Sequence, residues 1–179
     1  MVNPTDVPRI LLDAARLLKE GEIVVFGSAA LAFVLPEAPR TRDIDVWCDP
    51  PERGELLTVL MGELSWYQST HGVYVEVWAP ETFAAPLNWR SRAKVLTEET
   101  APDVRLVVPH PHDILFAKLE RWESGDREHA RRILAHLPMD LRRMRHLLAE
   151  TPYRVGLITD PLRIRDFEGH VPALERMIL

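Results

Sequence analysis

Cysteine and long apolar runs are both scarce in this sequence of 179 residues. Its single cysteine, Cys48, cannot form an intramolecular disulfide, and the lack of a disulfide framework is typical of proteins in a reducing compartment. No apolar run reaches the length that spans a membrane, and the polar, proline-containing start of the chain does not resemble a secretory signal. We therefore expect a soluble, cytoplasmic protein that makes no contact with a membrane.

An excess of positive charge is also missing. The formal net charge is −5 at pH 7, which does not indicate general electrostatic attraction to nucleic acid or to anionic lipid. His110 and His112 lie two residues apart, but no complementary cluster of histidine or cysteine accompanies them, which argues against a zinc site. His112 or Asp113 is better explained as the cap of a helix.

The residues that suggest chemistry are concentrated in positions 22–47. A short run rich in β-branched residues, Ile23–Phe26, ends at Gly27 and Ser28 and is followed by a helix-like segment, Ala29–Leu35. Glycine lets a phosphate approach the backbone closely, and Ser28 can cap the helix or donate its hydroxyl to a phosphate oxygen. The N–H groups at the start of a helix also favour anions.

A second strand is predicted for Asp43–Trp47. Because strand side chains alternate between faces, Asp43 and Asp45 share one face, roughly 7 Å apart, while Ile44 and Val46 point into a core. Two carboxylates on one face supply the oxygen ligands that Mg²⁺ prefers. A phosphate-binding turn beside a metal site predicts nucleotidyl or phosphoryl transfer.

This order of motifs resembles the nucleotidyltransferase superfamily with the polymerase-β-type fold. Gly27-Ser28 is followed after fourteen residues by Asp43-Ile44-Asp45, and the run from Arg40 to Asp45 is most similar to AbiEii and MenT-type toxin enzymes and their uncharacterised bacterial relatives. The resemblance implies transfer of a nucleoside monophosphate from a nucleoside triphosphate (NTP) to an acceptor hydroxyl, with Mg²⁺ or Mn²⁺ as cofactor. The acceptor could be an RNA end such as that of tRNA, a protein side chain or a small molecule, and a cognate antitoxin is a possible partner.

The same resemblance implies a third metal-binding carboxylate on a neighbouring strand. The clearest strand pattern in the chain, Val73–Trp78, places its valines on one face and Tyr74, Glu76 and Trp78 on the other. Glu76 is the natural candidate, because it is the only acidic residue within a strand pattern between Asp49 and Glu81. The alternative is an outward-facing glutamate on a half-exposed strand.

A second resemblance to these enzymes lies in the run of residues 108–119 followed by 125–129. It implies that Lys118 contacts nucleotide phosphates and that Asp126 supports the site. The alternative for Lys118 is a solvated residue on an amphipathic helix.

We predict an α+β fold, with a mixed sheet of four to six strands and flanking helices in a catalytic core (1–109), and a C-terminal helical region (110–179) packed on that core. Helices are expected at 5–20, 52–64, 114–122, 126–137 and 139–150, strands at 66–68, 93–96 and 104–108, a turn at 101–103, and two small helices in the tail after residue 152. In the predicted helix 52–64, Leu56, Leu57, Leu60 and Met61 form an apolar stripe that we assign to the core. The arginines of residues 126–150 could hold an RNA backbone or form ordinary surface ion pairs.

Two other functions fit parts of the pattern. A catalytically silent relative would bind a nucleotide or a partner protein without chemistry. A glycosyltransferase also uses Asp-x-Asp to hold a metal, but its motif normally follows a much longer nucleotide-binding half than the 42 residues available here.

Overall fold

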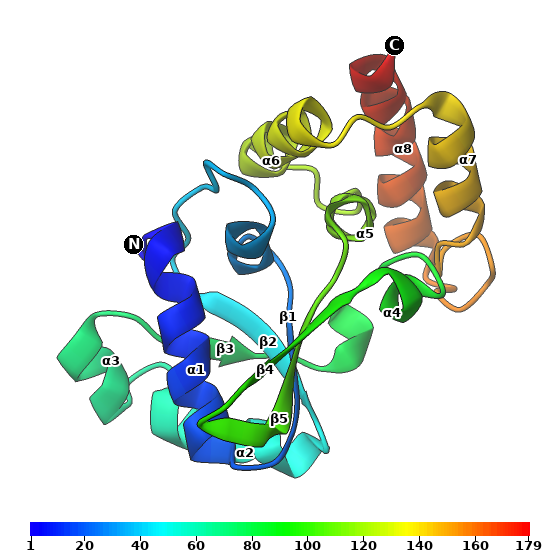
Figure 1. Ribbon diagram of the computed structural model, residues 1–179. Helices are drawn as coiled ribbons and strands as arrows, with labels where there is room; N and C mark the ends of the chain where they lie inside the picture. The colour runs from blue at the N-terminus through cyan, green and yellow to red at the C-terminus, as the bar shows by residue number, and fades with distance from the viewer. The chain divides into compact units, whose positions relative to one another are not determined.

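The strand β1 (Gly21–Val25) lies at the centre of a five-stranded mixed sheet with the order β3-β2-β1-β5-β4. The computed structural model describes all 179 residues, and Figure 1 shows this sheet with its surrounding helices. Ile23, Val24 and Val25 are fully buried, as expected for a central strand that is covered on both faces. β1 runs antiparallel to β2 (Ile44–Asp49) and parallel to β5 (Ala101–Val108). The predicted α+β fold with a mixed sheet is confirmed.

The remaining strands are β3 (Val75–Val77), parallel to β2 at one edge, and β4 (Lys94–Glu98), antiparallel to β5 at the other. The helices are α1 (Val7–Leu18), α2 (Pro51–Met61), α3 (Trp66–His71), α4 (Trp89–Arg92), α5 (Pro111–Ala117), α6 (Ser124–His136), α7 (Leu141–Ala149) and α8 (Pro161–Ile178), with 3₁₀ helices η1 (Pro4–Asp6), η2 (Ala29–Phe33) and η3 (Pro80–Thr82). No helix combines the length and the apolar character that crossing a bilayer requires.

The chain forms two compact units. The first unit comprises Met1–Thr82 and Ala93–Pro109 and contains the whole sheet, and the second comprises Phe83–Arg92 and His110–Leu179. In the first unit α1 packs against β5, and α2 packs against β2 and β3. The predicted packing of residues 110–179 on the catalytic core stays a prediction.

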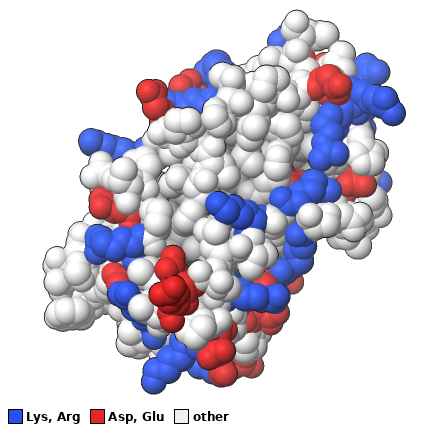
Figure 2. Space-filling view, viewed as in Figure 1, with Lys and Arg blue, Asp and Glu red and all other residues white.

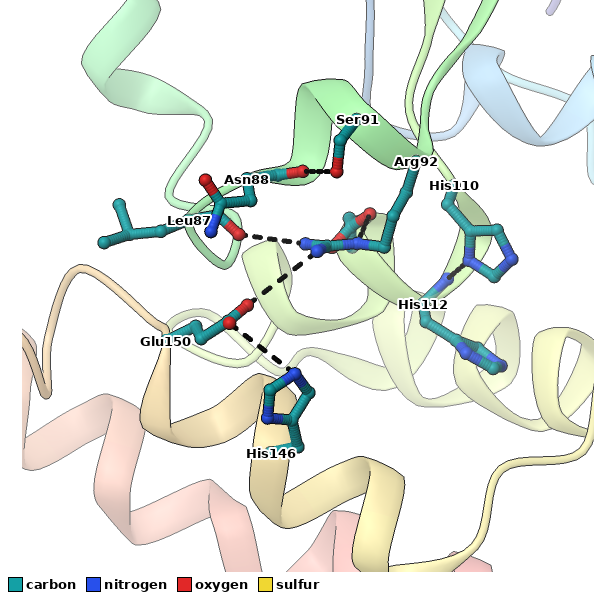
Figure 3. Close-up of polar contacts among 9 residues, drawn as sticks. Leu87, Asn88, Ser91, Arg92, His110, His112, His146 and Glu150 are labelled. Atoms are coloured by element: carbon teal, nitrogen blue, oxygen red, sulfur yellow. Dashed lines mark hydrogen bonds and ion pairs between the residues drawn. The ribbon is translucent and has the colours of Figure 1, made fainter.

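An ion-pair network attaches the segment 83–92 to the helices of the second unit (Figure 3). Arg92 donates from Nε and Nη2 to the fully buried carboxylate of Asp113, at 2.7 to 3.2 Å, and also to the carbonyl oxygen of Leu87. Glu150 lies 3.8 Å from Arg92 and 3.5 Å from His146. A buried carboxylate with a bidentate guanidinium partner is satisfied, so this network anchors the segment that interrupts the first unit in the sequence.

Several local predictions were wrong. The expected strand at 66–68 is helix α3, because the Ser65 side chain accepts a hydrogen bond from the N–H of Gln68 and caps a helical turn. Of the four residues in the predicted apolar stripe of α2, Leu57 and Met61 are buried, whereas Leu56 and Leu60 are each 37 % exposed. The buried pair lies at i and i+4, so the neighbouring pair is rotated away from the core.

Further corrections concern the later part of the chain. The turn expected at 101–103 lies earlier, because β5 begins at Ala101. His110, not His112 or Asp113, caps α5, with its ring nitrogen accepting from the N–H of His112. The tail forms one long helix, α8, that starts at the Asp160 cap and continues through Pro172.

Three arginines of residues 126–150 make surface ion pairs. Arg131 and Arg132 lie 3.3 and 3.0 Å from Glu128, and Arg145 lies 3.6 Å from Glu175. Figure 2 shows Lys and Arg side chains interspersed with Asp and Glu side chains over the visible face. These contacts favour the second of the two interpretations of the arginine-rich helices.

Candidate functional site

Three carboxylates meet on the first unit where β2 and β3 lie side by side. Asp43 directly precedes β2, Asp45 lies within it, and the parallel register pairs Asp45 with Glu76 of β3. One carboxylate oxygen of each residue lies within 4.8 Å of those of the other two, and all three side chains are half-buried. The alternation that puts Asp43 and Asp45 on one face, combined with this register, therefore brings together the three residues that we predicted as metal ligands.

The electrostatics of this carboxylate cluster are unfavourable without a cation. Burial raises the pKa of Glu76, and the negative charges of Asp43 and Asp45 raise it further. Three hard oxygen donors within reach of one another match the ligand preference of Mg²⁺ and Mn²⁺, so the residues present fit a divalent metal.

Gly27 lies against this cluster and has no room for a side chain. Its φ is +62°, and a Cβ atom built on its backbone would overlap the Oδ2 atom of Asp45. The N–H of Phe26 donates to the carbonyl oxygen of Asp45 at 3.0 Å, which keeps this part of the chain beside β2. Glycine is therefore required both by the backbone conformation and by the close approach of a metal-ligand candidate.

Ser28 follows at the start of η2. The predicted helix after the Gly-Ser turn is this short 3₁₀ helix, and the Ser28 side chain makes no capping hydrogen bond to it. Of the two uses that the sequence suggested for the hydroxyl, capping is therefore not observed. Its use as a phosphate donor stays a prediction.

Two aromatic residues of the Glu76 face donate hydrogen bonds to the aspartates. The Trp78 indole N–H donates to Oδ1 of Asp45 at 3.1 Å, and the Tyr74 hydroxyl lies 3.5 Å from Oδ2 of Asp43, a long hydrogen bond. The sequence alternation placed both residues on the same face as Glu76, but it gave no reason to assign either one to the site. Only the register between β2 and β3 shows that they meet the aspartates.

Lys118 and Asp126 form an ion pair inside the second unit. Their Nζ and Oδ1 atoms lie 2.9 Å apart, and the side chains are 9 % and 1 % exposed, so the interpretation of Lys118 as a solvated residue was wrong. Burial alone would raise the pKa of Asp126, but the hydrogen bonds and charges of Arg121 and Lys118 outweigh it and hold that pKa well below its ordinary value. Their predicted role in nucleotide binding stays a prediction.

Comparison with known proteins agrees with the site at the level of the family. No curated protein and no solved structure matches the chain. Residues 8–173 match the model of a family described as nucleotidyltransferases of unknown function (DUF6036), which covers the sheet, the carboxylate cluster and most of the second unit. The chain therefore belongs to this nucleotidyltransferase family.

Proposed function

We propose that this protein is a metal-dependent nucleotidyltransferase that moves a nucleoside monophosphate from an NTP to an acceptor hydroxyl. The observation that supports this proposal is the carboxylate cluster of Asp43, Asp45 and Glu76 on neighbouring strands. A cluster of like charges is unfavourable for folding unless a cation neutralises it, which points to function rather than to structural support.

Asp43, Asp45 and Glu76 would hold Mg²⁺ or Mn²⁺. A bound divalent ion stabilises the charge that develops on the attacking and leaving oxygens of an in-line displacement. Glu76 is also suited to accept the proton of the acceptor hydroxyl, because burial and the two aspartates raise its pKa. Gly27 and Ser28 are the proposed contacts for the triphosphate of the NTP, since the Gly27 backbone has no side chain to exclude it.

Lys118 and Asp126 have a more limited place in the proposal. Their mutual ion pair supports a structural role in the second unit. A phosphate contact by Lys118 is proposed from the sequence resemblance alone. A Lys118→Met variant that folds but binds NTP more weakly would support that contact.

The acceptor defines three versions of the proposal: an RNA end, a protein side chain or a small molecule. The resemblance of residues 40–45 to AbiEii and MenT-type enzymes is the argument for a toxin with a cognate antitoxin. That version predicts growth arrest when the wild-type protein is expressed, and normal growth with Asp45→Asn.

The decisive experiment is a transfer assay. Purified protein is incubated with each α-labelled NTP, with Mg²⁺ or Mn²⁺, and with separate pools of RNA, protein and small metabolites. Asp43→Asn and Asp45→Asn should abolish transfer without unfolding the protein, and Asp49→Asn is the matched control because Asp49 is exposed at the other end of β2.

Labelled product that requires both aspartates would establish the enzyme and the acceptor class. NTP binding without product in any pool, with either metal, would contradict the proposal and favour a catalytically silent nucleotide- or partner-binding member of the family. Transfer by Asp45→Asn at the wild-type rate would also contradict it.

A further inference from the structure

Trp78 is held beside the carboxylate cluster by both its backbone and its side chain. Its backbone N–H donates to the carbonyl oxygen of Val46 at 2.8 Å, which continues the pairing of β2 and β3 beyond the end of β3. Its indole N–H donates to Oδ1 of Asp45 at 3.1 Å. The sheet thus holds the backbone of Trp78 beside β2, and the hydrogen bond to Asp45 holds the indole.

Asp45 is therefore constrained on two sides. Oδ1 accepts from Trp78, and Oδ2 lies where only a glycine, Gly27, leaves space for it. An ionised carboxylate has about four acceptor positions, and the indole bond occupies one of them, so this bond is compatible with a cation on another. A metal ligand that is held by such outer contacts needs little reorganisation when the ion arrives.

The exposure of Trp78 is otherwise hard to explain. The residue is 42 % exposed at the edge of the sheet, where a large apolar side chain gains little from burial. Trp66 provides a comparison within the same unit. It is 76 % exposed and makes an edge contact with the ring of His71, at a centroid separation of 6.4 Å.

We infer that Trp78 is a positioning residue that orients Asp45 for the divalent metal. This inference rests on the proposed function, because it requires that Asp45 is a metal ligand. Tyr74 contacts Asp43 from the same face, but at 3.5 Å its hydrogen bond is longer, so we expect a smaller effect from its loss. Glu76 lies between these two donors in the sequence, so one strand face contributes a ligand and the contacts that orient two others.

The test measures metal binding directly and does not depend on catalysis. Mn²⁺ is titrated into the full-length protein, and free Mn²⁺ is measured by electron paramagnetic resonance. Trp78→Phe removes the N–H but keeps an aromatic ring, Trp66→Phe makes the same change at a site without a carboxylate partner, and Asp45→Asn alters the ligand itself. Circular dichroism and thermal melting establish that each variant is folded.

We expect Trp78→Phe to weaken Mn²⁺ binding roughly tenfold, because loss of a residue that orients a metal ligand typically costs 10- to 100-fold in affinity. Trp66→Phe should bind as the wild type does, and Asp45→Asn should lose the most. If Asp45→Asn loses affinity but Trp78→Phe binds within twofold of the wild type, the inference about Trp78 is wrong and the metal site stands. If Asp45→Asn binds Mn²⁺ as the wild type does, or the wild type binds none, both the inference and the proposed metal site are wrong.

If Trp78→Phe does not fold, the indole N–H signals of the unaltered protein provide a second test. The chain has 5 tryptophans, so its nuclear magnetic resonance spectrum should contain up to as many indole N–H signals. Saturation with diamagnetic Mg²⁺ should shift one of these signals far more than the others, because the indole N–H is bonded to a ligand atom. Mg²⁺ binding that leaves every indole signal in place would overturn the inference.

Discussion

The contact between Gly27 and Asp45 gives the sharpest prediction, because one substitution should separate stability from function. In Gly27→Ala the new Cβ meets the Asp45 carboxylate, which is the end of a side chain and can move aside. The remaining cost is the left-handed backbone, φ +62°, which is about 1–2 kcal/mol for a residue other than glycine. We therefore expect a folded protein whose free energy of unfolding falls by about that amount.

We expect Mn²⁺ affinity and the rate of nucleotidyl transfer to fall much more than the free energy of unfolding. The carboxylate that moves aside is one of the proposed metal ligands, and a displacement of about 1 Å can lower a rate roughly 100-fold. Urea denaturation measures the first effect, and Mn²⁺ titration with the nucleotidyl-transfer assay measures the second.

Gly72 supplies a matched control in the same unit. Its φ is +69°, but a Cβ atom there would meet nothing within 4 Å. Gly72→Ala should therefore lose a similar free energy of unfolding and keep its Mn²⁺ affinity and its activity. Gly27→Ala with wild-type affinity and rate would refute the argument, and an equal functional loss in Gly72→Ala would show that backbone strain alone explains the effect.

Three further predictions concern charged and titratable groups. Burial, and next the charge of Lys118, lowers the pKa of His129 from 6.5 to about 4. Between these two pH values the unfolded chain binds more protons than the folded one, so the free energy of unfolding should fall by up to about 3 kcal/mol as the pH drops from 6.5 to 4. Urea denaturation across this range should show that His129→Gln removes this dependence on pH. Lys118→Met should lower the free energy of unfolding by about 2 kcal/mol in the same assay. This loss is smaller than that of a buried carboxylate whose only partner is removed, because Asp126 keeps its hydrogen bonds to Arg121. Glu76→Gln removes a negative charge that burial and the two aspartates disfavour, so it should raise the melting temperature of the metal-free protein at pH 7. It also removes a proposed ligand and should weaken Mn²⁺ binding. A lower melting temperature would contradict the argument.

The carboxylate cluster was accessible from the sequence because its parts obey short-range rules. Alternation along a strand puts Asp43 and Asp45 on one face, and the order of Gly27-Ser28 before them suggested how the strands connect. The cluster became a prediction of three residues only through the family resemblance, which supplied a reason to look for Glu76. The structure adds the parallel register that pairs Asp45 with Glu76.

The errors arose where one local contact or a tertiary contact decides between two plausible structures. Trp66-Tyr67-Gln68 has the composition of a strand, but a single hydrogen bond from Gln68 to the Ser65 cap accompanies a helical turn instead. The tail contains Pro172, which ordinarily argues for a break, yet α8 continues through it and buries Phe167, Val171 and Leu174. Phe167 also stacks on Tyr153, with ring centroids 4.0 Å apart, so α8 has tertiary packing that a reading of Pro172 alone does not predict.

The residues that the sequence could not reveal are those that connect the site to its surroundings. Near β2 and β3 the chain departs from ordinary folding preferences three times: Gly27 has a left-handed backbone, Glu76 has a raised pKa, and Trp78 keeps a large ring exposed. Each departure taken alone has an ordinary explanation, such as a turn, a partly buried acid or a surface tryptophan. All three involve Asp45, as a close contact, as a neighbouring charge or as a hydrogen-bond acceptor, and it is this convergence on one carboxylate that argues for a built metal site.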